Sequence, residues 1–499
     1  RAENRSEGDG EGAEQVKLGE LLAAVPECRV RGGRDAEIAG LSLDSRTVRE
    51  GFLFAALPGA RRDGCDFVED AVRRGAAAVL AHREIPIHGR VPLVIAPDSR
   101  AALARIADRF HGSPSRELAV TGVTGTNGKT TVCYLARLIL DAAGHKTALL
   151  GTVEYLLGKR SIPAERTTPE SPALQAMLRE AKREGCDGVV MEVSSHALAQ
   201  RRIDCVRFAT AVFTNLGRDH LDYHGSPDGY FEAKASLFAA PGLGRAVVNV
   251  DDPRGRLLAE RSAAPVIAYG TGERAALAAR AIETGPRGSG FQMEYEGRQM
   301  PVRLPLIGRH NVLNALAAAG VALVAGVEAE AAAEALSRAD RVPGRLEEVR
   351  GKLPFRVFID YAHTAEALEC ALAAARGAGG GNLIVVFGCG GDRDQSKRRP
   401  MGRTAARLAD AAIITTDNPR GEDPLEIIAE IRRGFEETGK RPVTIPDRRE
   451  AIAAALAGAR AGDVVLVAGK GHERTQEIGS TVVPFSDRDV IAELAGPGE

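Results

Sequence analysis

The amino-acid sequence predicts an α/β protein of three domains: a small α/β N-terminal domain, a central domain with a mainly parallel sheet, and a C-terminal Rossmann-like α/β domain. Three observations lead to this prediction. The 499 residues exceed the size at which one hydrophobic core stops growing. Strand-like apolar runs alternate with helical ones over most of the chain. Turn and break signals stand near residues 113 and 341, where this alternation pauses.

The first region begins with a charged, Gly-rich stretch, and we expect residues 1–16 to form a disordered leader. Residues 17–113 then carry short apolar runs such as GFLFAALP and AAAVLAH, separated by turn signals. This pattern predicts a small α/β domain. An amphipathic helix ending in Gly-Ser-Pro indicates a linker and places the boundary near Ser113.

The second and third regions repeat a strand–helix alternation. Residues 114–341 contain strand-like runs such as ELAVTGV and GVVMEVS between helical ones, which is typical of a parallel sheet. The alternation restarts over residues 342–499, where FRVFIDYAH, NLIVVFGCGG, DAAIITTDNPR and DVVLVAGKGHE each end in a polar loop. Ligands bind at such carboxyl-end loops of open α/β sheets.

Composition excludes several classes of function. The chain is 44% hydrophobic and 27% charged with a formal net charge of -1, so no basic surface favours nucleic acid. No run of 18 apolar residues predicts a membrane span. The 7 cysteines are scattered and form no CxxC pair, which favours a reducing cytoplasm and disfavours a zinc site.

The stretch TGVTGTNGKTT, residues 121–131, predicts a phosphate-binding loop. A strand enters it and a helix leaves it, so backbone N–H groups and a helix N-terminus would face phosphates. Lys129 would neutralise them, and Thr130 is placed to put a hydroxyl on Mg²⁺. The spacing is unusual, because the general motif requires glycine where this chain has Val123.

Further candidates follow in the same region. Glu192 ends an apolar strand, the position of the acid that holds Mg²⁺ in many NTPases, although a strand-end Glu is as often structural. Asp219, His220, Asp222 and His224 offer ligands to a metal, or form only a solvated loop.

Lys234 is more informative. In a helix, Tyr230, Lys234, Leu237 and Phe238 share one apolar face, so this lysine either snorkels to solvent or is used.

These motifs together resemble the Mur ligase family. GTNGKTT, MEVSSHAL, NLGRDHLDYHG with YFEAK, GRHNVLNALAA, DYAHT, GCGGDRD, DNPR and GKGHE occur in the order expected of that family, from about residue 40 to 488. The family spells its loop G-T-N-G-K-T, which accounts for the unusual spacing.

The resemblance implies ATP-dependent amide ligation. In similar enzymes a carboxylate of a uridine-nucleotide peptide becomes an acyl phosphate, and the amine of an amino acid then attacks it. The nearest pattern within the family implies UDP-N-acetylmuramoyl-L-alanyl-D-glutamate and meso-diaminopimelate as substrates in peptidoglycan synthesis. It also implies Mg²⁺ and a cytoplasmic protein, which we expect to be a monomer.

By the same resemblance, residues 17–113 bind the UDP-muramoyl substrate, 114–341 form the central ATP-binding ligase domain, and 342–499 bind the amino acid. The implied catalytic residues are Lys129, Glu192, His220 and Lys234. Thr130 and Glu192 match the ligands of one Mg²⁺, and His220 and Lys234 those of another. The family lysine that Lys234 matches is carbamylated by CO₂ to N6-carboxylysine.

The remaining expected site residues fall into three sets, each implied by the resemblance. The ATP-binding set is Gly125, Thr126, Asn127, Gly128, Lys129, Thr130, Thr131, His310, Asn311 and Asp360. The UDP-muramoyl-dipeptide set is Leu43, Ser45, Thr167, Thr168, Ser194, Gln200 and Arg202. The diaminopimelate set is Arg393, Asp417, Asn418, Pro419, Arg420, Gly469 and Glu473.

Other functions fit the sequence less well. An NAD-binding module would need glycine at the position of Arg393 in VVFGCGGDRD. An NTPase switch would need the general loop spacing and a guanine motif. A lysine-adding relative remains an alternative, and a folylpolyglutamate-type ligase is a weaker one, since such enzymes are not expected to carry LSLDSR and DNPR. A non-catalytic structural role would leave the Lys-Thr loop without a use.

Overall fold

The computed structural model describes residues 15–59, 62–87 and 89–496. Residues 1–14, most of the predicted leader, lie outside the described residues. The predicted leader extends slightly too far, because Val16 already pairs with Ile38 in a short strand. The chain forms two compact units; the second comprises residues 119–168, 184–195 and 207–499, and the first comprises the rest.

The first unit contains a five-stranded sheet in the order β2-β7-β6-β5-β4, parallel except for β2. Its helix α3 packs against α5 within the same unit. The elements are β1 (Val16–Lys17), α1 (Leu18–Leu22), β2 (Arg29–Arg31), β3 (Glu37–Ile38), β4 (Gly40–Ser42), β5 (Phe52–Ala56), α2 (Val68–Arg73), β6 (Ala76–Ala81), β7 (Leu93–Ile95), α3 (Ser99–Phe110) and α5 (Ser171–Arg183).

The second unit holds an eleven-stranded sheet in the order β11-β10-β9-β12-β8-β13-β14-β15-β16-β17-β18. The strands from β9 to β16 in this order are parallel, as predicted. They are β8 (Ala119–Thr124), β9 (Thr147–Leu150), β12 (Gly188–Glu192), β13 (Phe208–Phe213), β14 (Arg245–Asn249), β15 (Val266–Gly270) and β16 (Leu277–Gly285).

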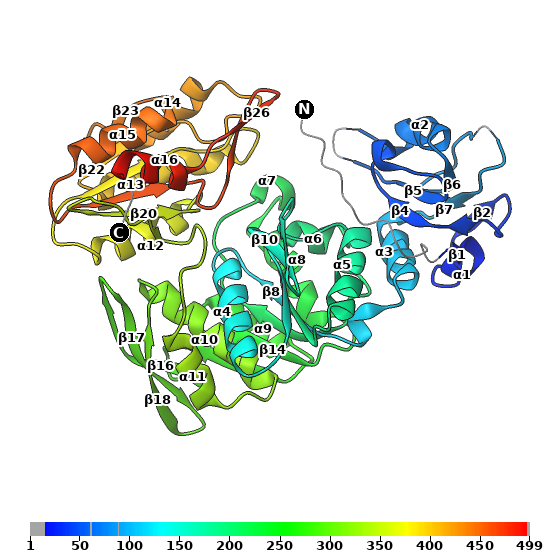
Figure 1. The fold of residues 1–499 in the computed structure, drawn as a ribbon, viewed down its shortest axis with the longest axis horizontal. Helices are drawn as coiled ribbons and strands as arrows, with labels where there is room; N and C mark the ends of the chain where they lie inside the picture. Colours follow the sequence, from blue (N-terminus) through cyan, green and yellow to red (C-terminus); the bar gives the residue numbers. More distant parts are fainter. Residues whose placement is uncertain (1–14, 60–61, 88, 497–499) are drawn as a thin grey trace. The chain divides into compact units, whose positions relative to one another are not determined.

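Both ends of this sheet are antiparallel, which the sequence pattern did not predict. One end is the hairpin of β10 (Glu154–Leu157) and β11 (Arg160–Pro163), and the other adds β17 (Gly288–Tyr295) and β18 (Arg298–Leu304) to β16. Burial alternates along β17 and β18, because one face packs on the core and the other faces solvent. Figure 1 shows these long strands beside α10 and α11.

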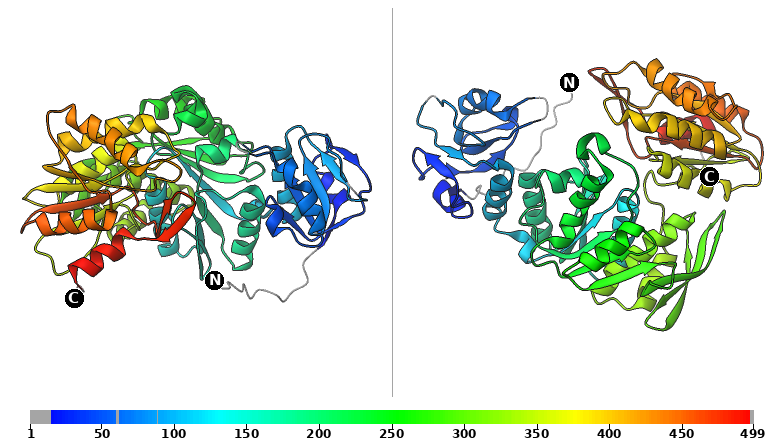
Figure 2. Two further views of the ribbon diagram at one scale, coloured as in Figure 1. Left: turned by 90° about the horizontal axis from the view of Figure 1, so that it is seen from above. Right: turned by 180° about the vertical axis from the view of Figure 1, so that it is seen from behind.

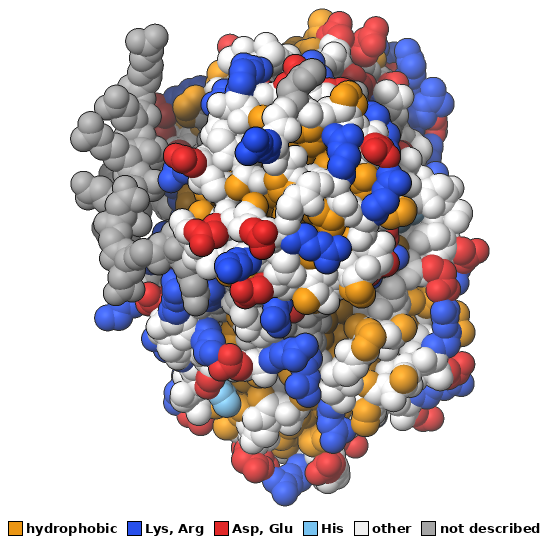
Figure 3. All heavy atoms as spheres, turned by 90° about the vertical axis from the view of Figure 1, so that its right-hand side faces the viewer, with side chains coloured by type: hydrophobic (Ala, Val, Ile, Leu, Met, Phe, Trp, Pro, Cys, Tyr) orange, Lys and Arg blue, Asp and Glu red, His pale blue; other side chains and the backbone are white. Residues whose placement is uncertain are grey.

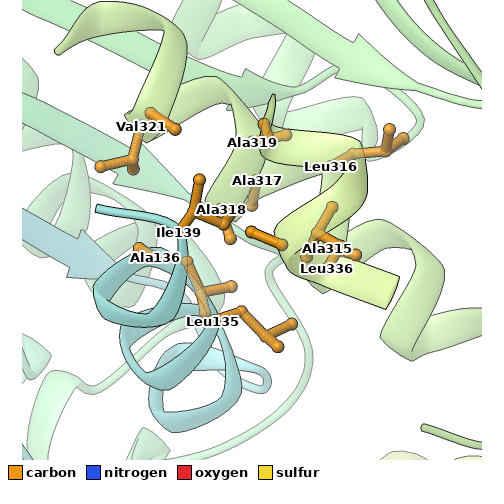
Figure 4. Packing of buried hydrophobic residues seen from close by; sticks show 14 of the residues in the cluster. Leu135, Ala136, Ile139, Ala315, Leu316, Ala317, Ala318, Ala319, Val321 and Leu336 are labelled. Atoms are coloured by element: carbon orange, nitrogen blue, oxygen red, sulfur yellow. The ribbon is translucent and has the colours of Figure 1, made fainter. Parts of the chain in front are cut away.

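Helix α4 (Lys129–Ala142) and helix α10 (Arg309–Val324) form the centre of the main core. Leu135, Ala136 and Ile139 of α4 lie against the alanine-rich face of α10 (Figure 4). The small side chains of α10 allow the two helices to pack closely. The other helices of this region are α7 (Leu221–His224), α8 (Pro227–Ala235), α9 (Pro253–Arg261) and α11 (Ala329–Ser337), whereas α6 (Ser195–Ala199) lies mostly in the first unit.

The C-terminal sheet has the order β19-β20-β24-β21-β22-β23, parallel except for β19. Separate apolar clusters cover its two faces, one with α12, α13 and α14 and the other with α15 and α16 (Figures 1 and 2). This is the predicted Rossmann-like arrangement. The elements are β19 (Glu347–Glu348), β20 (Arg356–Asp360), α12 (Ala365–Arg376), β21 (Leu383–Phe387), α13 (Arg398–Leu408), β22 (Ala411–Ile414), α14 (Pro424–Glu436), β23 (Val443–Thr444), α15 (Arg448–Gly458), β24 (Val464–Ala468), β25 (Thr475–Ile478), β26 (Thr481–Pro484) and α16 (Asp487–Ala495).

Surface and thiols agree with the composition. On the face drawn in Figure 3, basic and acidic side chains are interspersed. None of the helices in the described part of the chain has the length and apolar character needed to cross a membrane. All seven cysteines are free thiols. One of them, Cys65, lies near His82 and Asp63: its Sγ is 3.8 Å from His82 Nδ1, and His82 Nε2 is 3.6 Å from Asp63 Oδ2.

Candidate functional site

The predicted phosphate-binding loop connects β8 to the N-terminus of α4. Gly125 and Gly128 have φ values of 146° and 89°, which favour glycine over any residue with a side chain. A Cβ atom at Gly125 would collide with Thr214 Oγ1, and one at Gly128 would collide with Asn314 Oδ1. Both glycines of the G-T-N-G-K-T spelling are therefore required by the surroundings of the loop.

A neighbouring segment that follows β13 holds the loop in place. Asn215 accepts from Thr126 N through its carbonyl at 2.8 Å and from Asn127 N through Oδ1 at 3.0 Å. Thr214 Oγ1 donates to Asn127 O at 2.6 Å, and Gly217 N donates to Thr126 Oγ1 at 2.9 Å. The loop is thus held by hydrogen bonds to residues 214–217 of the protein itself.

Two lysines, the buried Lys234 and the half-buried Lys129, converge on one carbonyl of this loop. Lys129 Nζ and Lys234 Nζ donate to Gly125 O at 3.0 Å and 2.9 Å, and Lys129 also donates to Thr126 O at 2.8 Å. Burial lowers the pKa of both ammonium groups, and the charge of Lys129 lowers the pKa of Lys234 further. Lys234 is 1% exposed and lies 4.4 Å from the Tyr230 ring centroid, so the predicted apolar face is confirmed.

Glu192 lies directly beside the start of α4. Its Oε1 accepts from Thr130 Oγ1 at 2.9 Å and from Thr152 N at 2.7 Å, and its Oε2 accepts from Thr152 Oγ1 at 3.0 Å. Arg345 Nη2 donates to the same Thr130 hydroxyl at 2.8 Å. The structure therefore brings together the hydroxyl and the carboxylate that were predicted to share an ion.

His220 belongs to a cluster around a buried carboxylate. Asp219 Oδ2 lies 3.4 Å from His220 Nε2 and 3.7 Å from His363 Nε2. Burial alone would raise the pKa of Asp219, but the hydrogen bond and charge of His363, with the charge of His220, hold it below its ordinary range. His220 has a positive φ of 53°, an uncommon conformation for a residue with a side chain.

The predicted muramoyl-dipeptide residues fall in both units. In the second unit, Thr168 Oγ1 donates to Glu192 O at 2.9 Å and accepts from Ser194 N at 3.0 Å, and Thr167 accepts from Thr152. In the first unit, Arg202 donates to Gln200 Oε1 at 2.6 Å.

The other two predicted members of this set are also in the first unit. Leu43 packs partly buried against the core of the five-stranded sheet. Ser45 is buried in the turn that follows β4.

The expected adenine and ribose residues are built into structural contacts. Asn311 Nδ2 donates to Ile307 O at 2.9 Å, and its Oδ1 accepts from Asn314, the residue that contacts Gly128. Burial lowers the pKa of His310 to about 4. The Asp360 carboxylate accepts from Leu346 N at 2.6 Å and from Ala362 N at 2.7 Å. Thr131 is buried in the first turn of α4.

In the C-terminal domain, the DNPR loop meets the hairpin of β25 and β26. Arg420 Nε donates to Glu477 Oε2 at 2.8 Å, and Arg420 Nη1 donates to Gly391 O at 3.0 Å. Asn418 Nδ2 donates to Glu473 Oε2 at 2.8 Å, and both accept from Lys470. The structure thus joins Asn418 to Glu473, whereas Arg420 contacts Glu477 instead of Glu473.

The other predicted residues of this set line the same loops. Asp417 is buried, and its carboxylate occupies the space where a Cβ of Gly469 would stand. Pro419 O accepts from Glu422 N and leaves no room for a side chain at Gly391. Arg393 follows β21 and approaches Gly390.

Sequence reasoning missed several side chains that the structure places at these sites: Thr152, Arg345, His363, Lys470 and Glu477. Arg345 and His363 stand within the RVPGR and DYAHT motifs, so the motifs themselves carried a signal. Lys470 stands within GKGHE, beside two predicted residues. Thr152 and Glu477 have no comparable sequence signal.

Comparison with known proteins gives a consistent result. The Mur ligase middle domain matches residues 123–322, the Mur ligase glutamate ligase domain matches residues 344–471, and the Mur ligase catalytic domain matches residues 37–111.

Full-length relatives are similar as well. The UDP-N-acetylmuramoyl-L-alanyl-D-glutamate--2,6-diaminopimelate ligase of Geobacillus thermodenitrificans is 45% identical over 482 residues, which is 95% of this chain and 98% of the relative. The ligase of that name from Streptomyces coelicolor is 45% identical over 469 residues, 92% of each chain. A solved structure of a ligase with this name superimposes with a TM-score of 0.67 at 32% identity, covering 97% of this chain and 99% of the other. The chain therefore belongs to the Mur ligase family.

Proposed function

We propose that the protein is the ATP-dependent ligase that joins meso-2,6-diaminopimelate to the D-glutamate of UDP-N-acetylmuramoyl-L-alanyl-D-glutamate. One observation carries this proposal: a phosphate-binding loop held by its own hydrogen bonds lies in a chain that is 45% identical, over 95% of its length, to a ligase of that name. The preorganised loop supplies what phosphoryl transfer needs, namely backbone donors, a helix N-terminus and a cation.

The proposed reaction has two steps. The γ-phosphoryl group of ATP passes to an oxygen of the D-glutamate γ-carboxylate, which gives ADP and an acyl phosphate. An amine of diaminopimelate then attacks the acyl carbon, the carbon–oxygen bond breaks, and phosphate leaves with that carboxylate oxygen. Lys129 neutralises charge that develops on the transferred group, because its ammonium lies in the loop beside the helix N-terminus.

We expect two Mg²⁺ ions near the loop. Thr130 Oγ1 and Glu192 Oε1, 2.9 Å apart, are oxygen ligands of the kind that Mg²⁺ prefers. We assign the second ion to His220 and to a carbamate on Lys234. When bound, such ions neutralise the triphosphate and the developing negative charge.

Carbamylation of Lys234 requires an uncharged amine. The Nζ atom is buried beside Lys129, and both burial and that charge lower the pKa of Lys234. The neutral amine reacts with CO₂ to give a carbamate and a proton, which replaces a buried like charge with a carboxylate that can hold metal. The same reaction would relieve the repulsion between the two lysines.

The remaining residues are assigned by domain. Residues 17–113 would bind the uridine nucleotide through Leu43 and Ser45, and Thr167, Thr168, Ser194, Gln200 and Arg202 would hold the muramoyl dipeptide. Residues 114–341 would bind ATP, with His310, Asn311 and Asp360 near the base and ribose.

Residues 342–499 would bind diaminopimelate. Arg420 would grip its distal carboxylate and Glu473 the ammonium of the same end. Arg393, Asp417, Asn418, Pro419 and Gly469 would complete that site. We infer a cytoplasmic monomer, in keeping with seven free thiols.

Phosphate release tests the proposed function. The enzyme is incubated with ATP, Mg²⁺ and the UDP-muramoyl-dipeptide, and single amino acids are then added. We expect diaminopimelate to trigger phosphate release and a product of matching mass, whereas lysine gives a far lower rate. Comparable kcat/KM with lysine would instead establish the lysine-adding alternative.

A further inference from the structure

Lys470 is a fully buried lysine that the proposed mechanism does not use. It is 0% exposed and follows β24 in the GKGHE loop. Its ammonium group donates to Glu473 Oε2 at 2.8 Å, Asn418 Oδ1 at 3.1 Å and Thr475 O at 2.7 Å. An ammonium has three N–H donors, so these three acceptors saturate it. Lys470 therefore has no donor left for a ligand and can act only through its partners.

The first of these partners is the amide of Asn418. Its Oδ1 accepts from Lys470 and also from Glu477 N at 3.0 Å, while its Nδ2 donates to Glu473 Oε2 at 2.8 Å. A flipped amide would place an NH₂ group against the ammonium, which is a donor against a donor. Lys470 thereby fixes which end of the amide faces Glu473.

The second partner is the carboxylate of Glu473. Both hydrogen bonds, from Lys470 and from Asn418, go to Oε2. Among the residues that the structure describes, Oε1 takes no hydrogen bond, and the side chain is 27% exposed. One oxygen is thus anchored in the protein, and the other is presented to a ligand.

A purely structural role explains this arrangement less well. Replacing a buried ion pair by apolar residues is often neutral or stabilising, so burial of Lys470 is weak evidence for stability. Its side-chain acceptors are both residues of the predicted amino-acid site. The third acceptor is the carbonyl of Thr475, the first residue of β25. Glu477 of the same strand accepts a hydrogen bond from Arg420.

We propose that Lys470 is a positioning residue of the amino-acid site: it anchors Glu473 Oε2 and orients the Asn418 amide, so that Glu473 Oε1 alone receives the substrate's ammonium group. This inference rests on the proposed function, because it takes the amino acid to be diaminopimelate. Lys470 then determines affinity for the amino acid and leaves ATP and UDP-substrate binding unaffected.

A double-mutant cycle tests the proposal, with Lys470→Met, Glu473→Gln and the double variant compared with wild type. Methionine keeps most of the buried volume and removes the ammonium. We expect Lys470→Met to raise the KM for diaminopimelate roughly 10- to 100-fold, the range for a lost charge-assisted hydrogen bond, with the KM values for ATP and UDP-dipeptide within about threefold. In the Glu473→Gln background, adding Lys470→Met should raise the KM for diaminopimelate by less than about threefold, because Lys470 acts through Glu473.

Lys440→Met is the matched control, since Lys440 is an exposed lysine of the same domain that donates to Ala406 O, and it should behave as wild type. If Lys470→Met does not fold, Lys470→Gln, which keeps a donor in the pocket, takes its place in the cycle. An unchanged KM for diaminopimelate, an equal rise for all three substrates, or fully additive effects would overturn the proposal. Wild-type turnover with diaminopimelate tests the proposed function separately.

Discussion

At the scale of single residues, Lys129 and Lys234 differ in what surrounds them although both donate to Gly125 O. Lys129 stands at the first position of α4, directly after the glycine-rich loop. Lys234 approaches from α8 and lies over an aromatic ring. We assign the first to phosphate binding and the second to metal binding after carbamylation.

Replacing Lys129 should affect phosphoryl transfer. Lys129→Ala leaves the charge on the γ-phosphoryl group without its cation, and the loss of one preorganised electrostatic contact costs about 10²- to 10³-fold in rate. Single-turnover formation of ADP measures the effect. A decrease of less than tenfold would show that this loop does not hold the reacting nucleotide.

Replacing Lys234 should abolish ligation without unfolding the protein. Lys234→Ala removes the amine that we propose to be carbamylated and to hold metal, so we expect no turnover and a thermal midpoint close to that of wild type. The exposed Lys352→Ala variant is the control. Density for a carbamate on Nζ in a crystal grown near neutral pH would support the assignment, and near-normal turnover of the alanine variant would contradict it.

His310 gives the protein a pH dependence of stability. Its pKa is held at about 4 by burial, against an ordinary value of 6.5. In the unfolded chain the His310 imidazole takes up a proton near pH 6.5. In the folded protein the same imidazole stays neutral down to about pH 4. Stability that is fully present above pH 6.5 is therefore lost as the pH falls to about 4. His310→Asn should show a smaller drop in urea midpoint between pH 7 and pH 5 than wild type, and an equal drop would refute this account.

At the scale of elements, the strand β25 supports the candidate amino-acid site. Gln476 Nε2 donates to Asp417 O at 2.7 Å, Arg420 N donates to Glu477 O at 3.1 Å, and Glu477 Oε2 holds Arg420 Nε. Arg420 has a positive φ of 50°, which this docking maintains. The guanidinium is thus fixed on one edge by the hairpin.

This arrangement predicts the selectivity of the site for its amino acid. A fixed guanidinium can bind the distal carboxylate of diaminopimelate with two parallel bonds, whereas lysine leaves it unpaired. Arg420→Ala should lower kcat/KM for diaminopimelate by roughly 10²-fold or more without changing the KM for ATP. Arg420→Lys should not restore it, because an ammonium cannot form the bidentate pair. Full preference for diaminopimelate in Arg420→Ala would disprove the assignment.

Sequence reasoning predicted some elements better than others. The parallel strands and their carboxyl-end loops follow from local apolar runs, and the buried face of Lys234 follows from helical spacing. The antiparallel ends of the large sheet were not predicted. Strands β17 and β18 are long and have one solvated face, whereas the predicted strands were identified from short apolar runs. Contacts such as Arg345 to Thr130 join residues 215 positions apart, and no local pattern encodes such a distance.

At the scale of the whole molecule, the two large sheets of the second unit contribute loops at the carboxyl ends of their parallel strands. The strand β8 leads into the phosphate-binding loop, β12 leads from Glu192 to Ser194, and β24 leads into GKGHE. The expected function depends on these sets acting on one reaction, in which a carboxylate is activated by ATP and captured by an amine. The fate of the carboxylate oxygen records whether this happens.

The most direct test follows that oxygen. The enzyme is given UDP-N-acetylmuramoyl-L-alanyl-D-glutamate with ¹⁸O in the γ-carboxylate, together with ATP, Mg²⁺ and diaminopimelate, and the phosphate is examined by mass spectrometry. An acyl phosphate intermediate predicts one ¹⁸O atom in the phosphate for each amide bond formed. Unlabelled phosphate, or label recovered in AMP, would contradict the proposed ligase mechanism.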